Sequence, residues 1–349
     1  MNTITIGGKK IGDKNPCFII AEAGVNHNGD PYLAKKMIDV AARAGADAIK
    51  FQTFHSEDVV LETAGKADYQ KQTTGADESQ YSMIKKLELT ENNFSELARF
   101  AHKKKIMFIS TPFDIRSVEV LERIGVPAYK IPSGEINNNP LLSHIAQKQK
   151  PVIVSTGMAT LDEIHTAVTV LSENGVSQIA LLHCITSYPA KIEDLNLRVI
   201  QKLHHEFKVP IGFSDHSLGI IGSIVAVSMG ASIIEKHITL DKTMEGPDHR
   251  ASLDPEELFS LITGIRQIEL AMGDGIKKIT PDEMANRNVA RRSIVSLKDI
   301  STGSVIDGTM IALKRPGTGI EPRFLDRVKG KRAKVTIEKN TIISWEMLE

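Results

Sequence analysis

Residues 211–216 read IGFSDH, and residues 233–239 read IIEKHIT. Each stretch begins with apolar residues, as expected for a strand buried on both faces, and turns polar at its end. Six earlier stretches have the same form: residues 18–24 (FIIAEAG), 48–53 (AIKFQT), 107–113 (MFISTPF), 129–135 (YKIPSGE), 152–158 (VIVSTGM) and 179–184 (IALLHC). The sequence therefore predicts eight buried strands.

Helical patterns alternate with these strands, and several begin at Asp, Ser, Thr or Asn, the usual helix caps. They cover residues 31–44, 91–104, 115–124, 139–148, 161–174, 195–206, 220–229 and 255–272. The alternation implies parallel strands joined by right-handed crossovers. Eight such units predict an α/β fold with a closed (β/α)₈ TIM barrel, and an open doubly wound sheet is the alternative.

Two regions interrupt the alternation. Residues 54–90 form a long polar insertion after the second strand, where a loop of this length often covers an active site. The sequence ITIGGKKIG, within the first twelve residues, predicts a β-hairpin with a Gly-Gly turn. We expect this hairpin to cap the bottom of the barrel.

The chain divides by pattern after the last helix. Residues 1–273 are expected to form the barrel domain, and the polar stretch 274–288 is expected to be a linker. Residues 289–349 contain short strand-like pieces (RRSIVSLKDI, SVIDGTMIALKRPG and RAKVTIEKNTIIS) and predict a small β-rich domain. A domain of about 60 residues is only marginally stable alone, so we expect it to pack on another surface.

Composition limits the functions that the chain can have. Lys plus Arg and Asp plus Glu both number 43, so the formal net charge is zero, which argues against a nucleic-acid or membrane-surface binder. The two cysteines, Cys17 and Cys184, do not suggest a disulfide framework and suit a reducing cytoplasm. No signal peptide and no apolar run long enough to span a membrane is recognisable.

Every predicted strand carries a polar side chain at its carboxyl end, where TIM barrels build their active sites. These residues are Glu22, Lys50, Gln52, Thr111, Lys130, Ser133, Glu135, Ser155, Thr156, His183, Ser214, Asp215, His216, Glu235 and His237. Burying unpaired charges costs several kcal/mol each, so the charged members must pair with one another, a metal or a ligand. A purely structural barrel would not need them.

His216 and His237 end neighbouring strands and are candidate ligands of a divalent transition metal. The alternative is a pair of core histidines with satisfied hydrogen bonds. Because no third nitrogen or sulfur ligand is evident, oxygens would complete the coordination. This favours manganese, with magnesium or cobalt as alternatives, over structural zinc.

Lys50 and Lys130 are expected to form an anion-binding cradle with nearby hydroxyls. The hydroxyl residues are Thr111, Ser133, Ser155 and Ser214. A Schiff-base lysine is one alternative, and lysines that only pair with Glu22 or Glu135 are another. Glu22 and Glu135 are themselves the candidate acid–base groups.

Several motifs together resemble the sialic acid synthase family. They are AEAGVNHNG, IKFQTF, FISTPFD, YKIPSGE, VSTGMAT, LLHC, GFSDHS, EKHITLD and GPDHRASLDPEEL, and the tail RRSIV…ALKRPGTGI resembles the C-terminal antifreeze-like (SAF) domain of that family. The resemblance covers essentially the whole chain. It implies condensation of phosphoenolpyruvate with an N-acyl amino sugar and water to give a nine-carbon 2-keto sugar acid and phosphate. It also implies a domain-swapped homodimer.

The resemblance implies a role for each matching residue. His216 and His237 correspond to manganese ligands, Glu22 to the catalytic carboxylate and Glu135 to the group that holds metal-bound water. Lys50, Thr111, Lys130, Ser133, Ser155 and Ser214 correspond to the phosphoenolpyruvate-binding set. Gln52, Tyr188 and Asp248 correspond to sugar contacts, and Arg315 to a residue of the partner chain that reaches the acyl group of the sugar.

The identity of the sugar depends on residues 54–90, which the resemblance does not match one by one. N-acetylmannosamine, the precursor of N-acetylneuraminate, is the first prediction. The alternative is 2,4-diacetamido-2,4,6-trideoxymannose, the precursor of legionaminic acid. A phosphorylated sugar is disfavoured because residues 54–90 have no dense basic cluster. Rival functions are a metal-dependent aldolase or lyase on the same barrel and, from the small domain alone, a non-enzymatic carbohydrate- or ice-binding protein.

Overall fold

The computed structural model describes residues 3–75 and 77–349, so predictions for the first twelve residues and for 54–90 are judged without residues 1, 2 and 76. The described chain forms two compact units, residues 1–273 and 274–349, and each is described by itself. No helix in the described ranges is long and apolar enough to cross a membrane.

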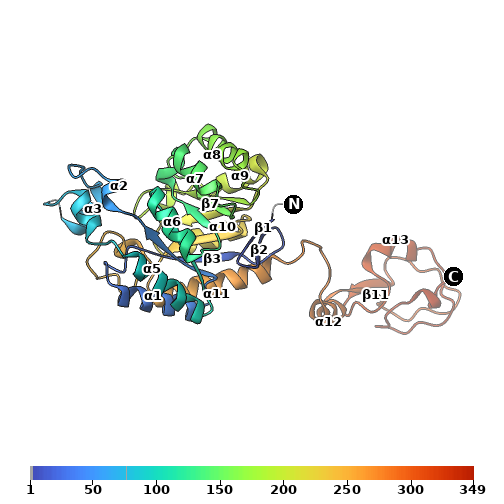
Figure 1. Ribbon diagram of the computed structural model, residues 1–349. Coiled ribbons are helices and arrows are strands. Elements are labelled where there is room, and N and C mark those ends of the chain that lie inside the picture. Colours follow the sequence, from blue (N-terminus) through green and yellow to red (C-terminus); the bar gives the residue numbers. More distant parts are fainter. Residues whose placement is uncertain (1–2, 76) are drawn as a thin grey trace. The chain divides into compact units, whose positions relative to one another are not determined.

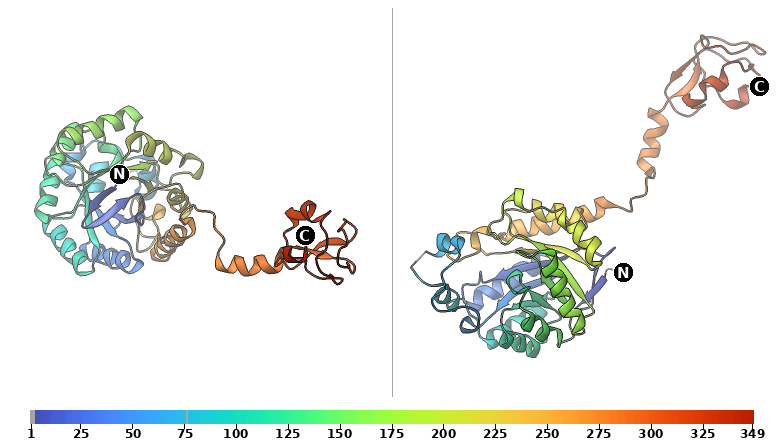
Figure 2. Two further views of the ribbon diagram at one scale, coloured as in Figure 1. Left: turned by 90° about the vertical axis from the view of Figure 1, so that its right-hand side faces the viewer. Right: turned by 90° about the horizontal axis from the view of Figure 1, so that it is seen from above.

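Eight parallel strands of the first unit close into a barrel, which confirms the predicted TIM barrel and excludes the open sheet. The order around the barrel is β10-β3-β4-β5-β6-β7-β8-β9. The bounds are β3 Phe18–Gly24, β4 Ala48–Thr53, β5 Met107–Pro112, β6 Tyr129–Ile131, β7 Val152–Ser155, β8 Ile179–Cys184, β9 Ile211–Asp215 and β10 Ile233–His237. Seen along the barrel, the helices form a ring around the strands (Figure 2, left).

The helices of the ring follow the predicted pattern closely. They are α1 Pro31–Ala44, α5 Glu91–Lys103, α6 Ile115–Ile124, α7 Asn139–Ala146, α8 Leu161–Glu173, α9 Val199–Phe207, α10 Ile221–Ser228 and α11 Pro255–Met272. The start of α1 shows why: the Asp30 side chain accepts a hydrogen bond from the backbone N–H of Tyr32, and Pro31 occupies the first turn. Gly45 ends this helix in the left-handed conformation (φ 89°) that glycine adopts without steric cost.

The bottom of the barrel is closed by the predicted hairpin of β1 Thr3–Ile6 and β2 Lys9–Gly12. Ile4, Ile6 and Ile11 are buried against the inward-facing apolar side chains at the amino-terminal ends of the strands. Figure 1 places this hairpin and the insertion after β4 at opposite ends of the barrel. The bottom is therefore a packed core, and only the other end is free to hold a site.

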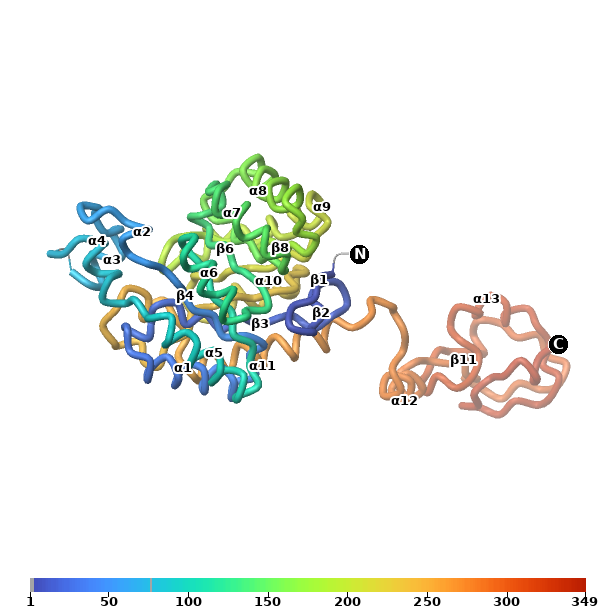
Figure 3. Tube along the Cα trace, in the orientation of Figure 1, coloured from blue at the N-terminus to red at the C-terminus, as the bar shows by residue number. Residues whose placement is uncertain are grey.

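The insertion of residues 54–90 is more ordered than the predicted polar loop. Its described residues contain three short helices, α2 Ser56–Val59, α3 Asp68–Thr74 and α4 Gln80–Lys85. Phe54 and Leu87 pack with Val25 in a small apolar cluster of their own. Figure 3 shows the three helices gathered at the end of the barrel where β4 leaves it.

The second unit has a separate core and a small antiparallel sheet. The sheet pairs β11 Ser293–Ser296 with β12 Ile311–Lys314, and the unit also holds α12 Pro281–Ala290, the short helix α13 Leu325–Val328 and a set of buried isoleucines. Two details differ from the prediction. Part of the expected linker is the helix α12, which Thr280 caps. Residues 332–344 form isolated bridges instead of a strand.

Candidate active site

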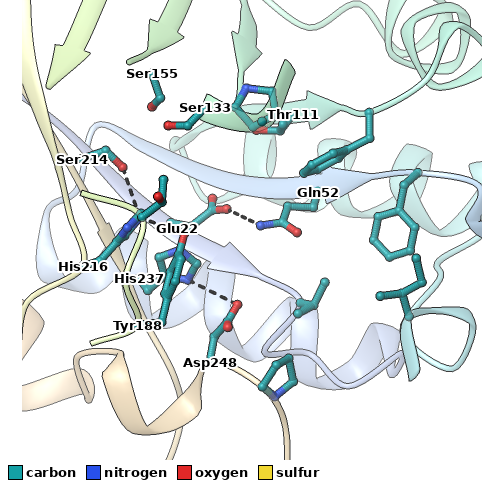
Figure 4. A pocket seen from close by; sticks show the side chains of 18 of the residues that line it. Glu22, Gln52, Thr111, Ser133, Ser155, Tyr188, Ser214, His216, His237 and Asp248 are labelled. Carbon is teal, nitrogen blue, oxygen red and sulfur yellow. Dashed lines mark hydrogen bonds and ion pairs between the residues drawn. The ribbon is translucent and has the colours of Figure 1, made fainter. Parts of the chain in front are cut away.

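A cavity of about 440 Å³ opens at the carboxyl ends of the barrel strands. Twelve of the fourteen residues to which the family resemblance gives a role line it: Glu22, Lys50, Gln52, Thr111, Lys130, Ser133, Ser155, Tyr188, Ser214, His216, His237 and Asp248. Figure 4 shows the hydroxyls of Ser133, Ser155 and Ser214 on the side of the cavity opposite Asp248. The barrel therefore gathers side chains from all parts of its sequence into one place.

The imidazoles of His216 and His237 lie side by side, with ring centroids 5.5 Å apart. His216 directly follows β9, which ends at Asp215, and His237 is the last residue of β10, the neighbouring strand. Gly24 makes room for His237, because an added Cβ there would lie 3.3 Å from Cε1 of the imidazole, tighter than most such contacts. Burial lowers the pKa of His216 to about 4 and lowers that of His237 well below its usual value. Both rings are therefore uncharged near neutral pH and can act as ligands.

The donor atoms around the two imidazoles fit a divalent cation. Nδ1 of His216 donates to the carbonyl oxygen of Ile185 at 2.7 Å, so its Nε2 carries the free lone pair. That nitrogen accepts a hydrogen bond from the Tyr188 hydroxyl at 3.0 Å. Buried atoms of this cavity without a hydrogen-bond partner among the described residues include Nδ1 of His237, Oε2 of Glu22 and Oδ1 of Asp248. Two neutral nitrogens with carboxylate oxygens nearby form a ligand set that suits manganese or a similar ion.

Lys50 and Lys130 lie beside one buried carboxylate, Glu235. The sequence predicts Glu235 at a strand end but indicates no role for it. Nζ of Lys50 lies 3.7 Å and Nζ of Lys130 3.5 Å from the carboxylate oxygens of Glu235. Burial alone would raise the pKa of Glu235, but Lys130 and Lys50 lower it to about 2. Glu235 is therefore ionised and holds the two ammonium groups in the cavity.

The hydroxyl residues complete the cationic side of the cavity. Thr111 accepts a hydrogen bond from Nζ of Lys50 at 2.9 Å, and Ser214 donates to Glu235 at 3.0 Å. The Ser155 hydroxyl is buried and has no partner among the described residues. Two buried lysines beside a hydroxyl that is free to donate form a site for a phosphate or carboxylate group.

Glu22 and Asp248 are buried carboxyl groups with raised pKa values. Burial raises the pKa of Glu22 despite Nζ of Lys50, which lies 2.9 Å from Oε1. Burial and the nearby Glu22 raise the pKa of Asp248 to about 7. Gln52 donates to Oε1 of Glu22 at 3.3 Å and fixes its orientation (Figure 4). A carboxyl group whose pKa is raised by burial is suited to give and take a proton during a reaction.

Comparison with known proteins agrees with this geometry. The sequence pattern of the NeuB family matches residues 37–277, and that of the SAF domain matches residues 291–349. The chain belongs to the NeuB family.

The similarity extends over nearly the full length of individual NeuB-family proteins. The N,N'-diacetyllegionaminic acid synthase of Campylobacter jejuni is 50% identical over 93% of this chain and 98% of its own. The N,N'-diacetyllegionaminic acid synthase of Legionella pneumophila is 45% identical over 98% of both chains. The crystal structure of an N-acetylneuraminic acid synthetase from Leptospira borgpetersenii, in complex with citrate, has a TM-score of 0.72 at 40% identity and covers 81% of this chain and 94% of that chain.

Glu135, a predicted site residue of the barrel unit, is not among the residues that line the cavity of this NeuB-family chain. Glu135 follows β6 in a 3₁₀ turn, and its carboxylate accepts a hydrogen bond from the Asn138 side chain at 2.7 Å. Strand β6 ends at Ile131, so Glu135 lies four residues beyond the end of the strand. Arg315 follows β12 in the second unit, where it is exposed.

Asp215 and Lys236 lie between the inward-facing residues of β9 and β10 and therefore point the other way, out of the barrel. Oδ2 of Asp215 lies 3.0 Å from Nζ of Lys236, and Asp215 also accepts hydrogen bonds from Ser217 and Ser223. Both side chains are at most 1% exposed. Asp215, which precedes His216 in the sequence, thus belongs to a structural ion pair behind the site and does not face the cavity.

We expect Lys236→Met to lower the free energy of unfolding by about 3 kcal/mol, because it leaves the buried Asp215 carboxylate without its cation. Lys242→Met is the matched control: Lys242 pairs with Glu257 at the surface and should contribute only about 0–1 kcal/mol. Chemical denaturation of both variants measures the difference. Equal stability losses in the two variants would contradict this account of the pair.

A second group of ligand-type side chains, His55, Asp58 and Asp114, lies outside the cavity lining. Its members are already used in the fold. Asp114 caps α6 by accepting from the backbone N–H of Ser117, and it also accepts from the backbone N–H of His55. Asp58 pairs with Arg116 at 2.9 Å. These contacts explain the cluster without a metal.

Proposed function

We propose that this protein joins phosphoenolpyruvate to an N-acyl amino sugar and water, forming a carbon–carbon bond and giving a nine-carbon 2-keto sugar acid and phosphate. The observation that carries the proposal is the composition of one cavity. It combines two buried lysines with several hydroxyls, two neutral histidines and a buried carboxyl group of raised pKa. The names of the NeuB-family relatives agree with a sugar-acid synthase.

The lysines and hydroxyls are proposed to bind phosphoenolpyruvate. Its phosphate and carboxylate need several donors, and Lys50, Lys130 and Ser155 supply them in a buried setting where charge-assisted hydrogen bonds are strong. Thr111, Ser133 and Ser214 surround the same position. Held there, the methylene carbon of phosphoenolpyruvate faces the side of the cavity where the histidines lie.

The histidines and Glu22 are proposed to act at the sugar. His216 and His237 would hold a divalent cation, which supplies Lewis acidity at the aldehyde of the open-chain sugar. The methylene carbon bonds to the aldehyde carbon, water adds to carbon 2 of the former phosphoenolpyruvate, and phosphate leaves with the bridging oxygen. Glu22 moves a proton to the new hydroxyl or from the water, since its pKa is raised by burial. Gln52, Tyr188 and Asp248 line the same side and are proposed sugar contacts.

A Schiff-base mechanism, as in an aldolase, is poorly supported at Lys50. Burial alone would lower the pKa of Lys50, but Glu22 and Glu235 outweigh burial and raise that pKa. An amine held in its charged form is a poor nucleophile. Release of phosphate that requires both substrates would separate the synthase from an aldolase or lyase.

The proposal is tested by a product assay with phosphoenolpyruvate and a panel of sugars. The panel contains N-acetylmannosamine, 2,4-diacetamido-2,4,6-trideoxymannose and a phosphorylated N-acyl sugar, with manganese present. We expect phosphate and a nine-carbon 2-keto acid, identified by mass spectrometry, with at least one unphosphorylated sugar. Phosphate release without any sugar, or no release with any of them, would refute the synthase.

We further propose that two chains share their sites, with Arg315 of each chain contacting the sugar bound by the other. The support is the resemblance of the tail ALKRPGTGI to the antifreeze-like domain of the family, together with the exposure of Arg315. The guanidinium can donate two hydrogen bonds to an acyl oxygen.

Arg315→Ala is expected to raise the KM for the sugar by roughly 10-fold to 100-fold, the loss expected for a charge-assisted hydrogen bond. The KM for phosphoenolpyruvate should stay unchanged. Arg323→Ala is the control, because Arg323 is also exposed in the second unit and pairs with Glu321. Mixing Arg315→Ala chains with Glu22→Gln chains should restore activity if sites are shared, and no restoration would contradict the shared site.

A further inference from the structure

The insertion of residues 54–90 supplies one wall of the cavity, and this wall carries no positive charge. Among the described residues that line the cavity, the only Lys or Arg side chains are Lys50 and Lys130, which come from the barrel. The exposed lysines of the insertion are paired elsewhere, for example Lys85 with Glu88 at 2.6 Å. The wall is therefore not built for a phosphorylated sugar.

The same wall is largely apolar. Val59, Val60, Met83 and Ile84 line the cavity from α4 and from the segment around α2. Val59 and Ile84 pack against the buried cluster of Val25, Phe54 and Leu87, so their positions are fixed by the core beneath them. A hydroxyl group placed against these side chains would lose its hydrogen bonds to water without replacement, whereas a methyl group would gain contacts.

One amide on this wall is free. Gln80, the first residue of α4, lines the cavity, and its side chain makes no hydrogen bond to any residue in the ranges that the structure describes. Gln70 lines it too but is occupied, since its oxygen accepts from the backbone N–H of Ala67 and its nitrogen donates to the Tyr69 hydroxyl. Gln80 can therefore both donate to and accept from a ligand.

The wall is held in place from both sides. The Tyr69 ring stacks on that of Tyr188 with centroids 5.2 Å apart, which joins α3 to the loop after β8. The buried ammonium of Lys66 donates to Thr74, to the carbonyl oxygen of Gly75 and to Glu78, and so fixes the segment leading to α4. These contacts make the wall a preformed surface.

We propose that Gln80 is a specificity-determining residue, whose amide binds the acyl-amino group on carbon 4 of a 2,4-diacetamido-2,4,6-trideoxy sugar. The proposal rests on the proposed function, which sets the aldehyde end of the sugar beside His216 and His237. The far end of the sugar then meets the insertion. The acetyl methyl and the carbon-6 methyl group lie against Val59, Val60 and Met83. A sugar with hydroxyls at carbons 4 and 6 lacks these methyl contacts and places its hydroxyls against apolar side chains.

The test compares two sugars on one variant. Gln80→Leu keeps the size of the side chain and removes both hydrogen-bonding atoms. We expect kcat/KM for the diacetamido sugar to fall about tenfold, while kcat/KM for N-acetylmannosamine and the KM for phosphoenolpyruvate stay nearly constant. Gln80→Asn, which shortens the amide by one methylene, should show the same selective loss. Gln72→Leu is the control, because Gln72 is exposed on α3 and does not line the cavity.

The outcomes separate this inference from the proposed function. Equal losses for both sugars, or no loss for either, overturn the role of Gln80 while the synthase reaction stands. A wild-type protein that uses N-acetylmannosamine but not the diacetamido sugar also overturns it and leaves the reaction intact. Failure to form a 2-keto acid with any sugar refutes the reaction itself and this inference with it.

Discussion

Glu22→Gln is expected to lower kcat by about 100-fold to 10,000-fold, the usual contribution of a positioned acid–base group. The Glu22 carboxyl is buried, its pKa is raised by that burial, and one of its oxygens has no partner among the described residues, so a proton can enter and leave there. Glutamine fills the same space and can still accept a hydrogen bond from Gln52, but its amide cannot act as an acid or a base. The variant should fold and bind phosphoenolpyruvate, because Lys50 keeps its second carboxylate, Glu235.

Steady-state kinetics, with phosphoenolpyruvate binding measured separately by calorimetry, check this expectation. Glu245→Gln is the control, since Glu245 is an exposed carboxylate that does not line the cavity. If Glu22→Gln keeps the full kcat, Glu22 does not transfer a proton. If it loses phosphoenolpyruvate binding in the same proportion, Glu22 serves to hold Lys50 instead.

His237→Ala is expected to abolish product formation and to weaken binding of manganese by more than about 100-fold, because it removes one of two imidazole ligands. Treatment of the wild-type protein with a chelator should likewise stop the reaction, and added manganese should restore it. Binding of Mn²⁺, followed by electron paramagnetic resonance or calorimetry, gives a reading that does not depend on activity.

His165→Ala is the matched control for the histidine, because His165 lies exposed on α8 and contacts Glu206 there. It should bind manganese as the wild type does. A His237→Ala protein with unchanged manganese affinity and full activity would show that the histidine pair is not a metal site.

The strand ends explain why so much of the site could be predicted from sequence. Parallel strands of a barrel all end on the same face, so a polar residue at the end of each apolar run already indicates where the site lies. The alternation of side chains decides the details. Ser214 and His216 face inward, whereas Asp215 between them pairs with Lys236 behind the barrel. Sequence pattern alone did not separate these two groups, because both faces of a barrel strand are buried.

For other residues the position depends on tertiary contacts, which the sequence pattern does not show. Glu135 ends an apolar run like the other candidates, but Pro132 and the following 3₁₀ turn take it away from the cavity and towards Asn138. Gln80 and the apolar residues near it lie in or beside short helices of a polar insertion. These helices are too short to show a recognisable spacing of apolar residues. Their position depends on the stack of Tyr69 on Tyr188 and on the hydrogen bonds of Lys66 to the segment leading to α4.

The central claim is that phosphoenolpyruvate is a carbon nucleophile here and not a phosphoryl donor. The measurement that tests it most directly uses phosphoenolpyruvate with heavy oxygen in the bridge between carbon and phosphorus, incubated with sugar and manganese. We predict that the label leaves entirely with phosphate and that the 2-keto acid takes its new oxygen from water. Label retained in the organic product, or phosphate transferred to the sugar, would contradict the account.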